Sequence, residues 1–482
     1  MDFGLVRKIL GNILKIEAAL MAVPFTVSLL WREPAAIAFV WSIAITAAAG
    51  ILLGLGRVEI KEIKTREALM LVTLAWVAVS AFAALPYLLS GAIAEPTEAF
   101  FEAVSGLTTT GATVIDNVEI LPRGILFWRS LTSWFGGMGI LLLTLTVLPS
   151  LGVVGFQMYK AELPGPTTDK LAPRLVDTVK ILYLVYGGMT LVQTIMLTAG
   201  GLSLFDALLL AFATVSTGGF SPYNTSIAPF SANSYVIIII SVWMILSGVN
   251  FGLYYDLWRG RWRRVIQNSE LRLYLALVTI GVFAVAWNLC SSLAYSWFEG
   301  VKHALVQVSS IVTTTGYTSV DYNQWPAFSK LVLFLLMFTG ACAGSTTGAI
   351  KLIRLIIAGK LVKREVAHLL HSRAMVPITV NNGYVVPEET IRSVCAFLFL
   401  YLALFAAGTV ILSAEGISMA TSASAVAAAL GNVGPGFGAV GPAHTYSQFS
   451  PWATMLLTAL MLLGRLELFT MIAVITPGYW KQ

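Results

Sequence analysis

Charged residues are scarce in this sequence. Asp, Glu, Lys and Arg make up only 11% of its 482 residues, whereas 57% are hydrophobic and the mean hydropathy is +0.82. A soluble protein of this length needs far more charge to cover its surface. Apolar stretches of about 20 residues recur along the chain, and each is long enough to cross the hydrocarbon core as a helix. The composition therefore excludes a soluble protein and predicts an all-α, polytopic membrane protein.

Cysteine and histidine are also scarce. The three cysteines, Cys290, Cys342 and Cys395, have the spacing of neither a metal site nor a disulfide framework, and the four histidines show no ligand spacing. The sequence contains no Ser/His/Asp cluster, no phosphate-binding loop and no dinucleotide-binding fingerprint. It therefore argues against an enzyme, and it predicts that any control by a nucleotide comes from a partner protein.

The net charge of +6 is unevenly distributed. Lys and Arg cluster in alternating loops, near residues 7–15, 57–66, 160–180, 259–272 and 351–373. An even number of predicted membrane crossings lies between each of these loops and the next. This positive-inside pattern predicts a multi-pass protein with a cytoplasmic N-terminus, and the family resemblance described below implies that its membrane is the cell inner membrane. The basic surplus therefore records topology and argues against nucleic-acid binding, although it also suits anionic membrane lipids. The basic loops near 259–272 and 359–373 are either docking surfaces for a cytosolic partner or topology signals alone.

The chain divides into an opening helix pair and four similar units. Apolar helices are expected at about 9–30 and 35–55, within a first segment of residues 1–60. Each later unit has a full span, a short half-membrane helix, a Gly-containing loop and a second full span. The predicted units are residues 61–155, 156–262, 263–375 and 376–482. Their predicted helices are 67–90, 98–110 and 124–149; 179–199, 205–217 and 234–255; 272–296, 301–315 and 328–357; and 391–412, 419–431 and 451–475.

The loops that follow the short helices share a glycine. Because a short helix cannot cross the bilayer, it enters and returns on one side, and its loop lies at membrane depth. We align the loops on Gly111, Gly218, Gly316 and Gly434, which gives a repeat of about 100–120 residues. The predicted fold is therefore four pseudo-symmetric helix–pore-loop–helix repeats around a central pore, plus two extra N-terminal helices.

Four such loops at one axis can form an ion path. Irregular backbone at membrane depth must be buried in protein or line a wet cavity, because its unpaired polar groups cannot face lipid. Carbonyl oxygens aimed at the axis can replace the hydration shell of a cation, as in potassium channels. The negative ends of the four short helices would add to this attraction, and acidic residues at their starts, such as Asp206 and Glu98, are expected to be caps. Close helix packing by small residues is the alternative for any single loop.

The predicted selectivity filter takes three residues from each loop. They are Thr109, Thr110, Gly111, Ser216, Thr217, Gly218, Thr314, Thr315, Gly316, Asn432, Val433 and Gly434. Potassium ligands are predicted at Thr110, Gly111, Thr217, Gly218, Thr315, Gly316, Val433 and Gly434.

Further motifs complete a resemblance to a known family. Residues 134–139, 161–166, 344–348 and 464–467 accompany the four loops. Together they resemble the Trk/Ktr/HKT superfamily of potassium transporters over nearly the whole chain, closest to the TrkH subunit of bacterial Trk systems. The two extra N-terminal helices are similar to TrkH and unlike KtrB. The resemblance implies a homodimer and a cytosolic TrkA-like ring that binds nucleotide and NAD. It implies K⁺ as the transported ion and no covalently bound cofactor.

A gate is predicted beneath the filter. The predicted span 328–357 is too long for one straight crossing, and its Gly/Ser/Thr-rich middle should break the helix and line a cavity. The resemblance implies that this middle obstructs the path, whereas a flexible kink without a gating role is the alternative. Its residues are Gly340, Ala341, Cys342, Ala343, Gly344, Ser345, Thr346, Thr347 and Gly348.

Arg465 is the second part of the predicted gate. It lies deep in the last apolar span, where an arginine is costly and usually functional. Below the filter it would repel cations, and it could bond the carbonyl groups of residues 344–348. A structural ion pair is the alternative for Arg465, although Glu467 should project from a different helix face. Lys351 and Arg354 are predicted to be interfacial anchors.

The predicted function is potassium-selective uptake through a gated channel. In the plant members of the superfamily, Ser at the first filter position accompanies sodium preference, so the resemblance makes Gly111 point to potassium. A symporter coupled to H⁺ or Na⁺ is the alternative, and it would need a titratable group in the path. Apart from Arg465, we recognise no ionisable residue deep in the spans that line the path, which favours passive flux. A membrane receptor with a vestigial filter is a third alternative.

Overall fold

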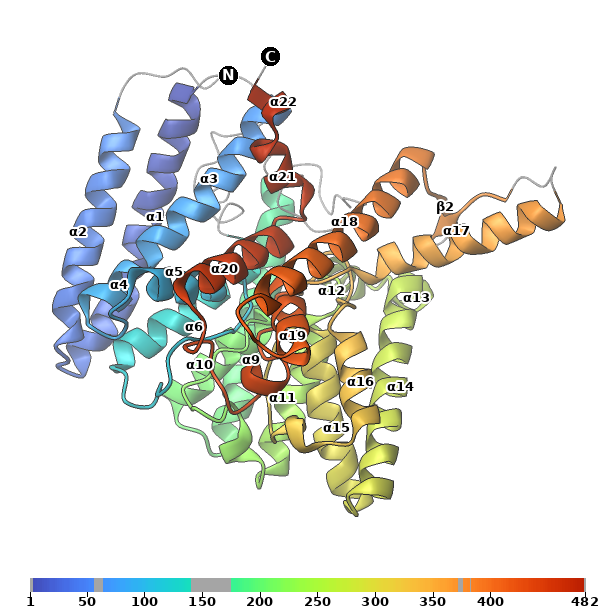
Figure 1. Ribbon diagram of the computed structural model, residues 1–482. Coiled ribbons are helices and arrows are strands. Elements are labelled where there is room, and N and C mark those ends of the chain that lie inside the picture. Colours follow the sequence, from blue (N-terminus) through green and yellow to red (C-terminus); the bar gives the residue numbers. More distant parts are fainter. Residues whose placement is uncertain (1–2, 56–63, 140–174, 372–375, 382, 481–482) are drawn as a thin grey trace.

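The structure is almost entirely helical. This computed structural model describes residues 3–55, 64–139, 175–371, 376–381 and 383–480 (Figure 1). Within these ranges the single sheet is an antiparallel pair of two-residue strands, β1 (Thr379–Val380) and β2 (Tyr384–Val385). The prediction of an all-α protein is therefore correct. The motif at 161–166 and the end of the span predicted over 124–149 lie outside the described residues.

A helical hairpin opens the chain and forms one flank of the molecule (Figure 1). It consists of α1 (Phe3–Leu30) and α2 (Ala35–Gly54). A Cβ atom on Gly11 would lie 2.6 Å from the Gly50 carbonyl oxygen, so these two glycines let the backbones approach closely. The inner face of α1 packs against the first unit, and both termini of the chain lie at the same end of the molecule.

In each of the four units a long helix precedes a short helix, as expected. The first has α3 (Thr65–Ala83), α4 (Leu85–Leu89), α5 (Pro96–Leu107) and α6 (Arg123–Gly137). The second has α9 (Leu175–Ala199), α10 (Leu204–Val215), η2 (Ala228–Phe230), α11 (Ser234–Ser247), α12 (Phe251–Trp258) and α13 (Trp262–Gln267). The third has α14 (Ser269–Ser292), α15 (Trp297–Val312), η3 (Tyr322–Gln324), α16 (Ala327–Leu336) and α17 (Leu352–Leu370). The fourth has α18 (Glu388–Ser413), α19 (Met419–Leu430), η4 (Gly438–Val440), α20 (Pro451–Arg465), α21 (Phe469–Ile475) and α22 (Pro477–Trp480).

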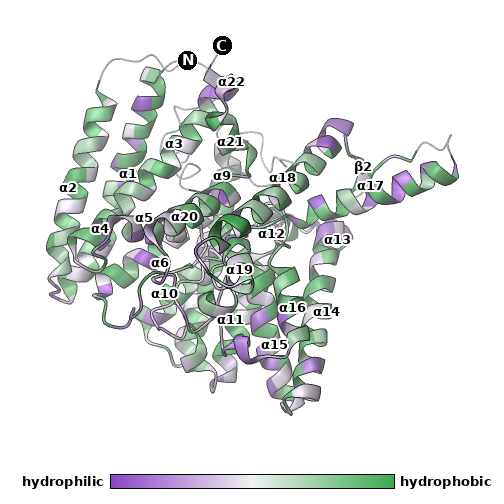
Figure 2. Ribbon diagram, viewed as in Figure 1, coloured by the Kyte–Doolittle hydropathy of each residue, from purple (hydrophilic) through white to green (hydrophobic). Residues whose placement is uncertain are grey.

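The composition of the long helices suits a membrane. Among the described residues, six helices are long and apolar enough to cross one, or up to eight if each of two bent pairs is one span. Figure 2 shows hydrophobic residues along these helices, while hydrophilic residues gather on α17 and at helix ends. The protein is therefore a multi-pass membrane protein.

The short helices α5, α10, α15 and α19 have 12, 12, 16 and 12 residues, too few to span the bilayer. Three of them begin at a serine N-cap, of which Ser203 is typical. Its hydroxyl accepts from the Asp206 backbone N–H at 3.1 Å and donates to the Asp206 carboxylate at 2.7 Å. Asp206 therefore belongs to a helix cap, as expected, and Glu98 likewise lies in the first turn of α5.

Two predicted continuous spans are wrong. Residues 234–255 form α11 and α12, which meet at 92°, and residues 451–475 form α20 and α21, which meet at 119°. At the first corner, Asn250 caps α12 by accepting from the Gly252 backbone N–H. At the second, Glu467 and Leu468 adopt positive φ angles of 60° and 55°. Only the third break, between α16 and α17, was expected from its glycine-rich composition.

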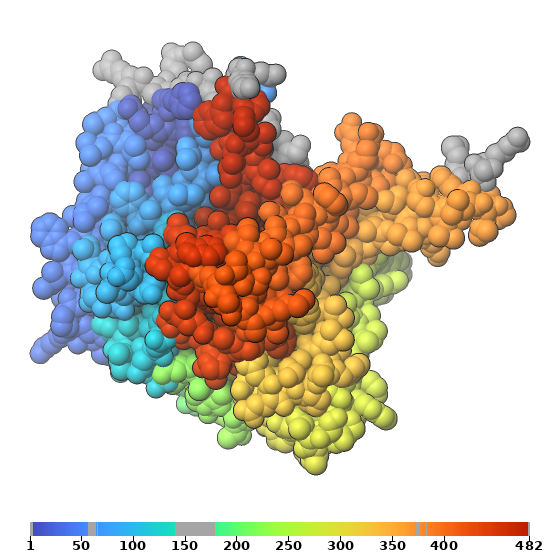
Figure 3. Space-filling view, viewed as in Figure 1, coloured from blue at the N-terminus to red at the C-terminus, as the bar shows by residue number. Residues whose placement is uncertain are grey.

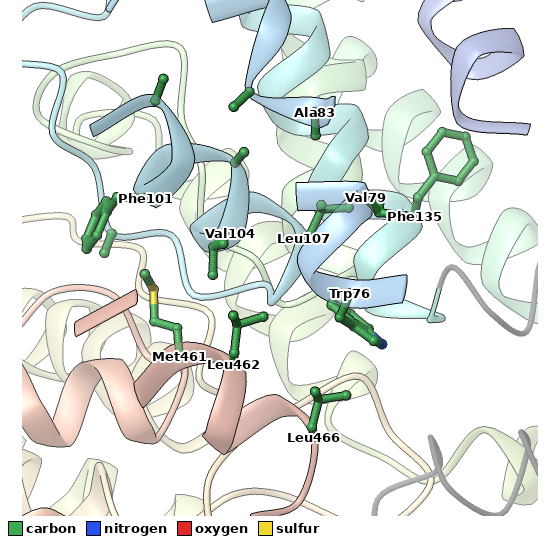
Figure 4. Packing of buried hydrophobic residues seen from close by; sticks show 14 of the residues in the cluster. Trp76, Val79, Ala83, Phe101, Val104, Leu107, Phe135, Met461, Leu462 and Leu466 are labelled. Atoms are coloured by element: carbon green, nitrogen blue, oxygen red, sulfur yellow. The ribbon is translucent and has the colours of Figure 1, made fainter. Parts of the chain in front are cut away.

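The first short helix lies inside the hydrophobic core. Figure 4 shows Phe101 and Val104 of α5 facing Met461 and Leu462 of α20, with α3 nearby. These side chains belong to one buried cluster that spans the first and fourth units. The core therefore joins units that are far apart in sequence, and it fixes where the loop after α5 emerges.

The helix α17 extends away from the body of the molecule (Figures 1 and 3). It begins in the interior, where Leu352 and Ile353 are buried, and most of its later residues are exposed. The opening hairpin lies on the opposite flank of the molecule. Of the described elements, α17 projects furthest from the body (Figure 1).

Candidate functional site

The four loops after the short helices share one backbone conformation. The C-cap residues of the short helices are Thr108, Ser216, Thr313 and Gly431. The next residue of each loop has a positive φ of 53° to 56°, and these residues are Thr109, Thr217, Thr314 and Asn432. Two positions later a glycine with positive φ follows in every loop, and these glycines are Gly111, Gly219, Gly316 and Gly434.

This common conformation corrects the alignment of the second loop. The sequence alignment placed Gly218 with Gly111, but Gly219 is the glycine with positive φ, at 69°. Gly218 therefore occupies the position of Thr110, and Thr217 occupies that of Thr109. The ligand pair predicted at Thr217 and Gly218 thus shifts by one residue, to Gly218 and Gly219. Because Gly218 and Gly219 are consecutive, the sequence allowed either of them to align with Gly111. The positive φ angle selects Gly219.

The four loops also form a closed ring. A Cβ atom on each of these glycines would overlap a carbonyl oxygen of the next loop, so only glycine fits there. The pairs, glycine first, are Gly111 with Gly218, Gly219 with Thr315, Gly316 with Val433, and Gly434 with Thr110. The contacts run from the first unit through the second, third and fourth and back to the first. The carbonyl groups of Thr110, Gly218, Thr315 and Val433 therefore stand around one axis.

A cavity lies on one side of this ring. Its volume is about 180 Å³, and its lining includes all four glycines of the ring. Asp116 also lines it and accepts hydrogen bonds from the hydroxyl groups of Thr445 and Ser447. The cavity opens between the loops that follow the filter, and a carboxylate at this mouth would favour the approach of cations.

A buried ion pair supports the first loop from behind. The Arg129 Nε atom donates to Glu102 Oε1 at 2.8 Å, and neither side chain is exposed to solvent by more than 3%. Glu102 also accepts from the Val114 backbone N–H, while Arg129 donates to the Ser221 carbonyl and lies over the Phe220 ring. The pair therefore connects α5 and α6 with the loops of two units. The sequence analysis missed it, although two opposite charges in apolar helices were a usable signal.

The predicted gate segment docks beneath the ring. The Thr217 hydroxyl donates to the Thr346 hydroxyl at 3.2 Å, and the Thr314 hydroxyl accepts from the Gly348 backbone N–H at 2.8 Å. A Cβ atom on Gly348 would also lie 2.9 Å from that of Asn432. Residues 346–348 therefore contact the second, third and fourth loops on the side away from the cavity.

Arg465 lies at the same level and completes the contacts. Its Nη1 donates to the Thr346 carbonyl at 2.9 Å and to the Thr109 hydroxyl at 3.3 Å. Its Nη2 donates to the carbonyl groups of Gly136 and Gly137 at 2.6 and 3.0 Å. The hydrogen bond expected between Arg465 and the gate segment is thus present. Arg465 joins this segment to the first loop and to the end of α6.

The gate segment has a defined structure of its own. Gly340 N–H donates to the Ile350 carbonyl at 2.8 Å, and Ile350 N–H donates to the Phe338 carbonyl at 3.2 Å. The segment from Gly340 to Gly348 is therefore a loop whose two sides pair near their base, within the break between α16 and α17. Its tip, at Thr346, reaches the ring of loops at Thr217.

Lys351 and Arg354 are not the interfacial anchors that the sequence predicted. Lys351 is 1% exposed, not an interfacial anchor, and its ammonium group donates to the carbonyl and hydroxyl oxygens of Thr347. Arg354 is also buried and forms an ion pair with Glu467. The break before α17 draws these residues into the interior, where an ammonium or guanidinium group needs acceptors. Arg465 is therefore not the only ionisable residue near the path.

The comparisons with known proteins agree with this arrangement. The family model described as "TrkH: Cation transport protein" matches residues 35–478. The chain is 37% identical to a Trk system potassium uptake protein TrkH of Halomonas elongata and 36% identical to the TrkH of Escherichia coli strain K12, with both chains covered completely in each case. The crystal structure of the potassium transporter TrkH from Vibrio parahaemolyticus matches with a TM-score of 0.88 at 32% identity, again over both whole chains.

Proposed function

Because the chain belongs to the TrkH family of cation transport proteins, we propose that it is a potassium-conducting subunit of an uptake system. Its relatives are named Trk system potassium uptake proteins, which supports potassium as the ion. The membrane is then the cell inner membrane, with the N-terminus in the cytoplasm, as the positive-inside pattern indicates. The cavity lined by Asp116 faces the outside.

The ring of carbonyl groups carries this proposal. Thr110, Gly218, Thr315 and Val433 each direct one carbonyl into a ring that four glycine contacts close. A dehydrated potassium ion at the axis would exchange water oxygens for these carbonyl oxygens. The C-terminal ends of the four short helices carry partial negative charge and point at the same place, so they stabilise a cation halfway through the membrane.

The segment from Gly340 to Gly348 and Arg465 serve as the gate of this path. In the present arrangement Thr346 lies under the ring, and the guanidinium group of Arg465 places a positive charge beside it. A cation leaving the filter would meet a physical obstruction and a like charge. Opening requires that Arg465 and the segment exchange their hydrogen bonds with Thr109, Thr217 and Thr314 for other partners.

Passive, gated flux fits the buried charges better than coupled symport. The Glu102 carboxylate already pairs with Arg129 and accepts hydrogen bonds from the Thr113 hydroxyl and the Val114 backbone N–H. The Lys351 ammonium group already donates to Thr347. Neither group therefore offers an obvious site for a second, coupled ion in the path. Symport with H⁺ or Na⁺ predicts that the reversal potential of the potassium current shifts with a pH or sodium gradient. Passive flux predicts reversal at the potassium Nernst potential under both conditions.

Two partners complete the proposal: a second copy of the chain and a cytosolic TrkA-like ring. Exposed apolar residues recur at helical spacing on the projecting helix α17, at Val362, Val366, Leu369 and Leu370. Such a stripe suits the interface of a homodimer. The basic residues of α17 and of the 259–264 loop suit a regulatory ring, through which nucleotide or NAD would act.

Rubidium uptake tests the proposed function directly. Purified protein in liposomes should take up ⁸⁶Rb⁺ against an internal potassium load, and external K⁺ should compete far better than Na⁺. Liposomes without protein give the background, and cells that lack their own potassium importers should regain growth at low potassium. A chain that carries no Rb⁺ in either system would be the scaffold or receptor of the third alternative.

A further inference from the structure

Two backbone amides, one within the gate segment and one just after it, donate to a single carboxylate oxygen. Glu270, in the first turn of α14, is 3% exposed. Its Oε1 atom accepts from the Ala343 backbone N–H at 2.8 Å and from the Ile353 backbone N–H at 3.0 Å. These residues lie before and after the part of the segment that reaches the filter. A single side chain from α14 therefore ties the loop to the first turn of α17.

Both amide groups depend on this oxygen. Ala343 and Ile353 are 5% and 1% exposed, so water cannot replace a lost acceptor without entering the core. Ile353 also lies in the first turn of α17, whose N-cap residue Lys351 makes no side-chain capping bond. The Glu270 carboxylate thus caps α17 from another helix, at the end where exposed N–H groups favour negative charge.

The neighbouring corner between α11 and α12 holds only one side of the loop. Cys342 N–H donates to the Gly248 carbonyl at 3.1 Å, and Phe251 N–H donates to the Gly344 carbonyl at 3.1 Å. These backbone bonds place residues 342–344 but do not reach α17. One backbone bond already joins this side of the loop to the projecting helix, because the Leu352 N–H donates to the Ala341 carbonyl at 3.2 Å. Glu270 adds a second connection, made by a side chain, at Ala343 and Ile353.

We infer that Glu270 is a positioning residue of the gate. Its carboxylate holds Ala343 next to the first turn of α17. This contact keeps the loop compact, so that its tip docks under the filter. Movement of α17 reaches Ala343 through this oxygen, in addition to the backbone bond from Leu352 to Ala341. The inference rests on the gating role in the proposed function and adds the residue that links gate and helix.

Basal flux of three variants tests this role. Glu270→Leu removes the acceptor and should raise basal ⁸⁶Rb⁺ uptake into liposomes about tenfold, since two buried amides lose their partner. Glu270→Gln keeps an amide oxygen at the same place and should remain within about twofold of the parent chain. Glu17→Leu is the matched control: Glu17 is equally buried, and its carboxylate has no hydrogen-bond partner among the described residues. The control should leave basal uptake unchanged.

The readouts separate positioning from a general loss of structure. The Rb⁺/Na⁺ selectivity of Glu270→Leu should stay that of the parent, because the carbonyl ring does not contact Glu270. If the parent conducts and Glu270→Leu is no leakier, or if Glu270→Gln leaks as much as Glu270→Leu, the inference is wrong. A parent chain that conducts no Rb⁺ would instead refute the proposed function on which the inference rests.

A second variant covers the case in which Glu270→Leu does not fold. Glu270→Asp keeps the charge but withdraws the oxygen by one methylene group, so it should also leak. Cys342, which is fully buried in the loop, then reports the loosened base. In a chain with Cys290→Ala and Cys395→Ala, maleimide should label Cys342 faster in Glu270→Asp than in the parent. Equal labelling together with equal flux would overturn the inference.

Discussion

At the residue scale, four residues with positive φ decide the shape of the filter. Thr109, Thr217, Thr314 and Asn432 leave their short helices in the left-handed conformation, which costs energy for any residue other than glycine. Three of their side chains bond the proposed gate: Thr109 meets Arg465, Thr217 meets Thr346, and Thr314 meets Gly348. The Asn432 amide instead donates to the Thr110 hydroxyl and the Met461 carbonyl. The surrounding contacts therefore hold this strain at the point where filter and gate touch.

The corrected register predicts different effects for two adjacent glycines. Gly219→Ala would place its Cβ on the Thr315 carbonyl oxygen at a φ of 69°, so it should lower Rb⁺/Na⁺ selectivity at least about tenfold. Gly218→Ala meets only the Ser133 and Ser216 side chains and should be milder. Selectivity is measured by ⁸⁶Rb⁺ and ²²Na⁺ uptake into liposomes.

A relief variant provides the control for this pair. Ser133→Gly removes the Cβ that lies 2.7 Å from a Cβ on Gly218, so it should restore Gly218→Ala but not Gly219→Ala. Gly316→Ser, which presses on the Val433 carbonyl in the same way, should resemble Gly219→Ala and raise sodium flux relative to potassium. Equal effects at Gly218 and Gly219 would contradict the register.

Arg465 predicts a leak that depends on the shape of the side chain. Arg465→Ala removes donors to four oxygen atoms and should raise basal ⁸⁶Rb⁺ uptake about tenfold. Arg465→Lys keeps the charge, but one ammonium group cannot reproduce the planar fork, so an intermediate leak is expected. If Arg465→Lys is as tight as the parent chain, charge alone closes the path, and if neither variant leaks, Arg465 is not part of the gate.

At the element scale, the four units are similar but not equivalent. Six residues before its C-cap, α5 carries Glu102, and the same position of α10 and α19 holds Leu210 and Ala425. The partner position, seven residues after the N-cap of the following helix, is Arg129 in α6 and Ile240 in α11. In the second unit, an apolar pair thus occupies the two positions that the ion pair occupies in the first unit.

This comparison predicts how stability responds at the ion pair. Glu102→Ala leaves the Arg129 charge buried and should cost about 3–5 kcal/mol, whereas Glu102→Leu with Arg129→Ile should recover most of this loss. The double variant still lacks the Arg129 bond to Ser221, so its Rb⁺/Na⁺ selectivity should remain impaired. Thermal midpoints in detergent and uptake into liposomes measure the two effects. A double variant as unstable as Glu102→Ala would contradict the interpretation.

Helix breaks are also decided at this scale. The predicted break before α17 lies in a run of glycine, serine and threonine, which is visible in the sequence. The corners at Gly248 and Glu467 lie in short polar interruptions, 247–250 and 464–467, of otherwise apolar stretches. They form because Gly248 packs against Tyr274, and because Glu467 pairs with Arg354, which is 113 residues away. No local pattern contains those partners, so the two spans were predicted to be continuous.

At the scale of the whole molecule, the projecting helix α17 has an apolar stripe that the other described residues leave exposed. Leu369 and Leu370 are 87% and 73% exposed, and Val362 and Val366 extend the stripe by two turns. Because α17 starts at the gate, a contact made along this helix is mechanically connected to the ion path. Assembly and gating are therefore expected to be coupled.

This arrangement predicts that charge on the stripe separates the two copies. Val366→Glu with Leu370→Glu should convert a detergent-solubilised dimer into a monomer, because burying two carboxylates in an apolar contact is costly. Light scattering measures the molecular mass. Lys363→Glu, on the polar part of the same helix, is the matched control and should leave the dimer intact. A double variant that remains dimeric would place the interface elsewhere.

Local sequence patterns alone predicted the membrane class, the four units and their glycine loops. Apolar length and turn residues determine local structure through contacts with residues that are close in the chain. Register, by contrast, came from the tertiary structure: Gly219 is chosen over Gly218 by the Thr315 carbonyl of another unit. Three-dimensional contacts likewise drew Lys351 and Arg354 into the interior, and brought Glu270 to both Ala343 of the gate segment and Ile353 of α17. A buried charge or a strained backbone is stable only beside its acceptor, and here those acceptors are distant in the chain.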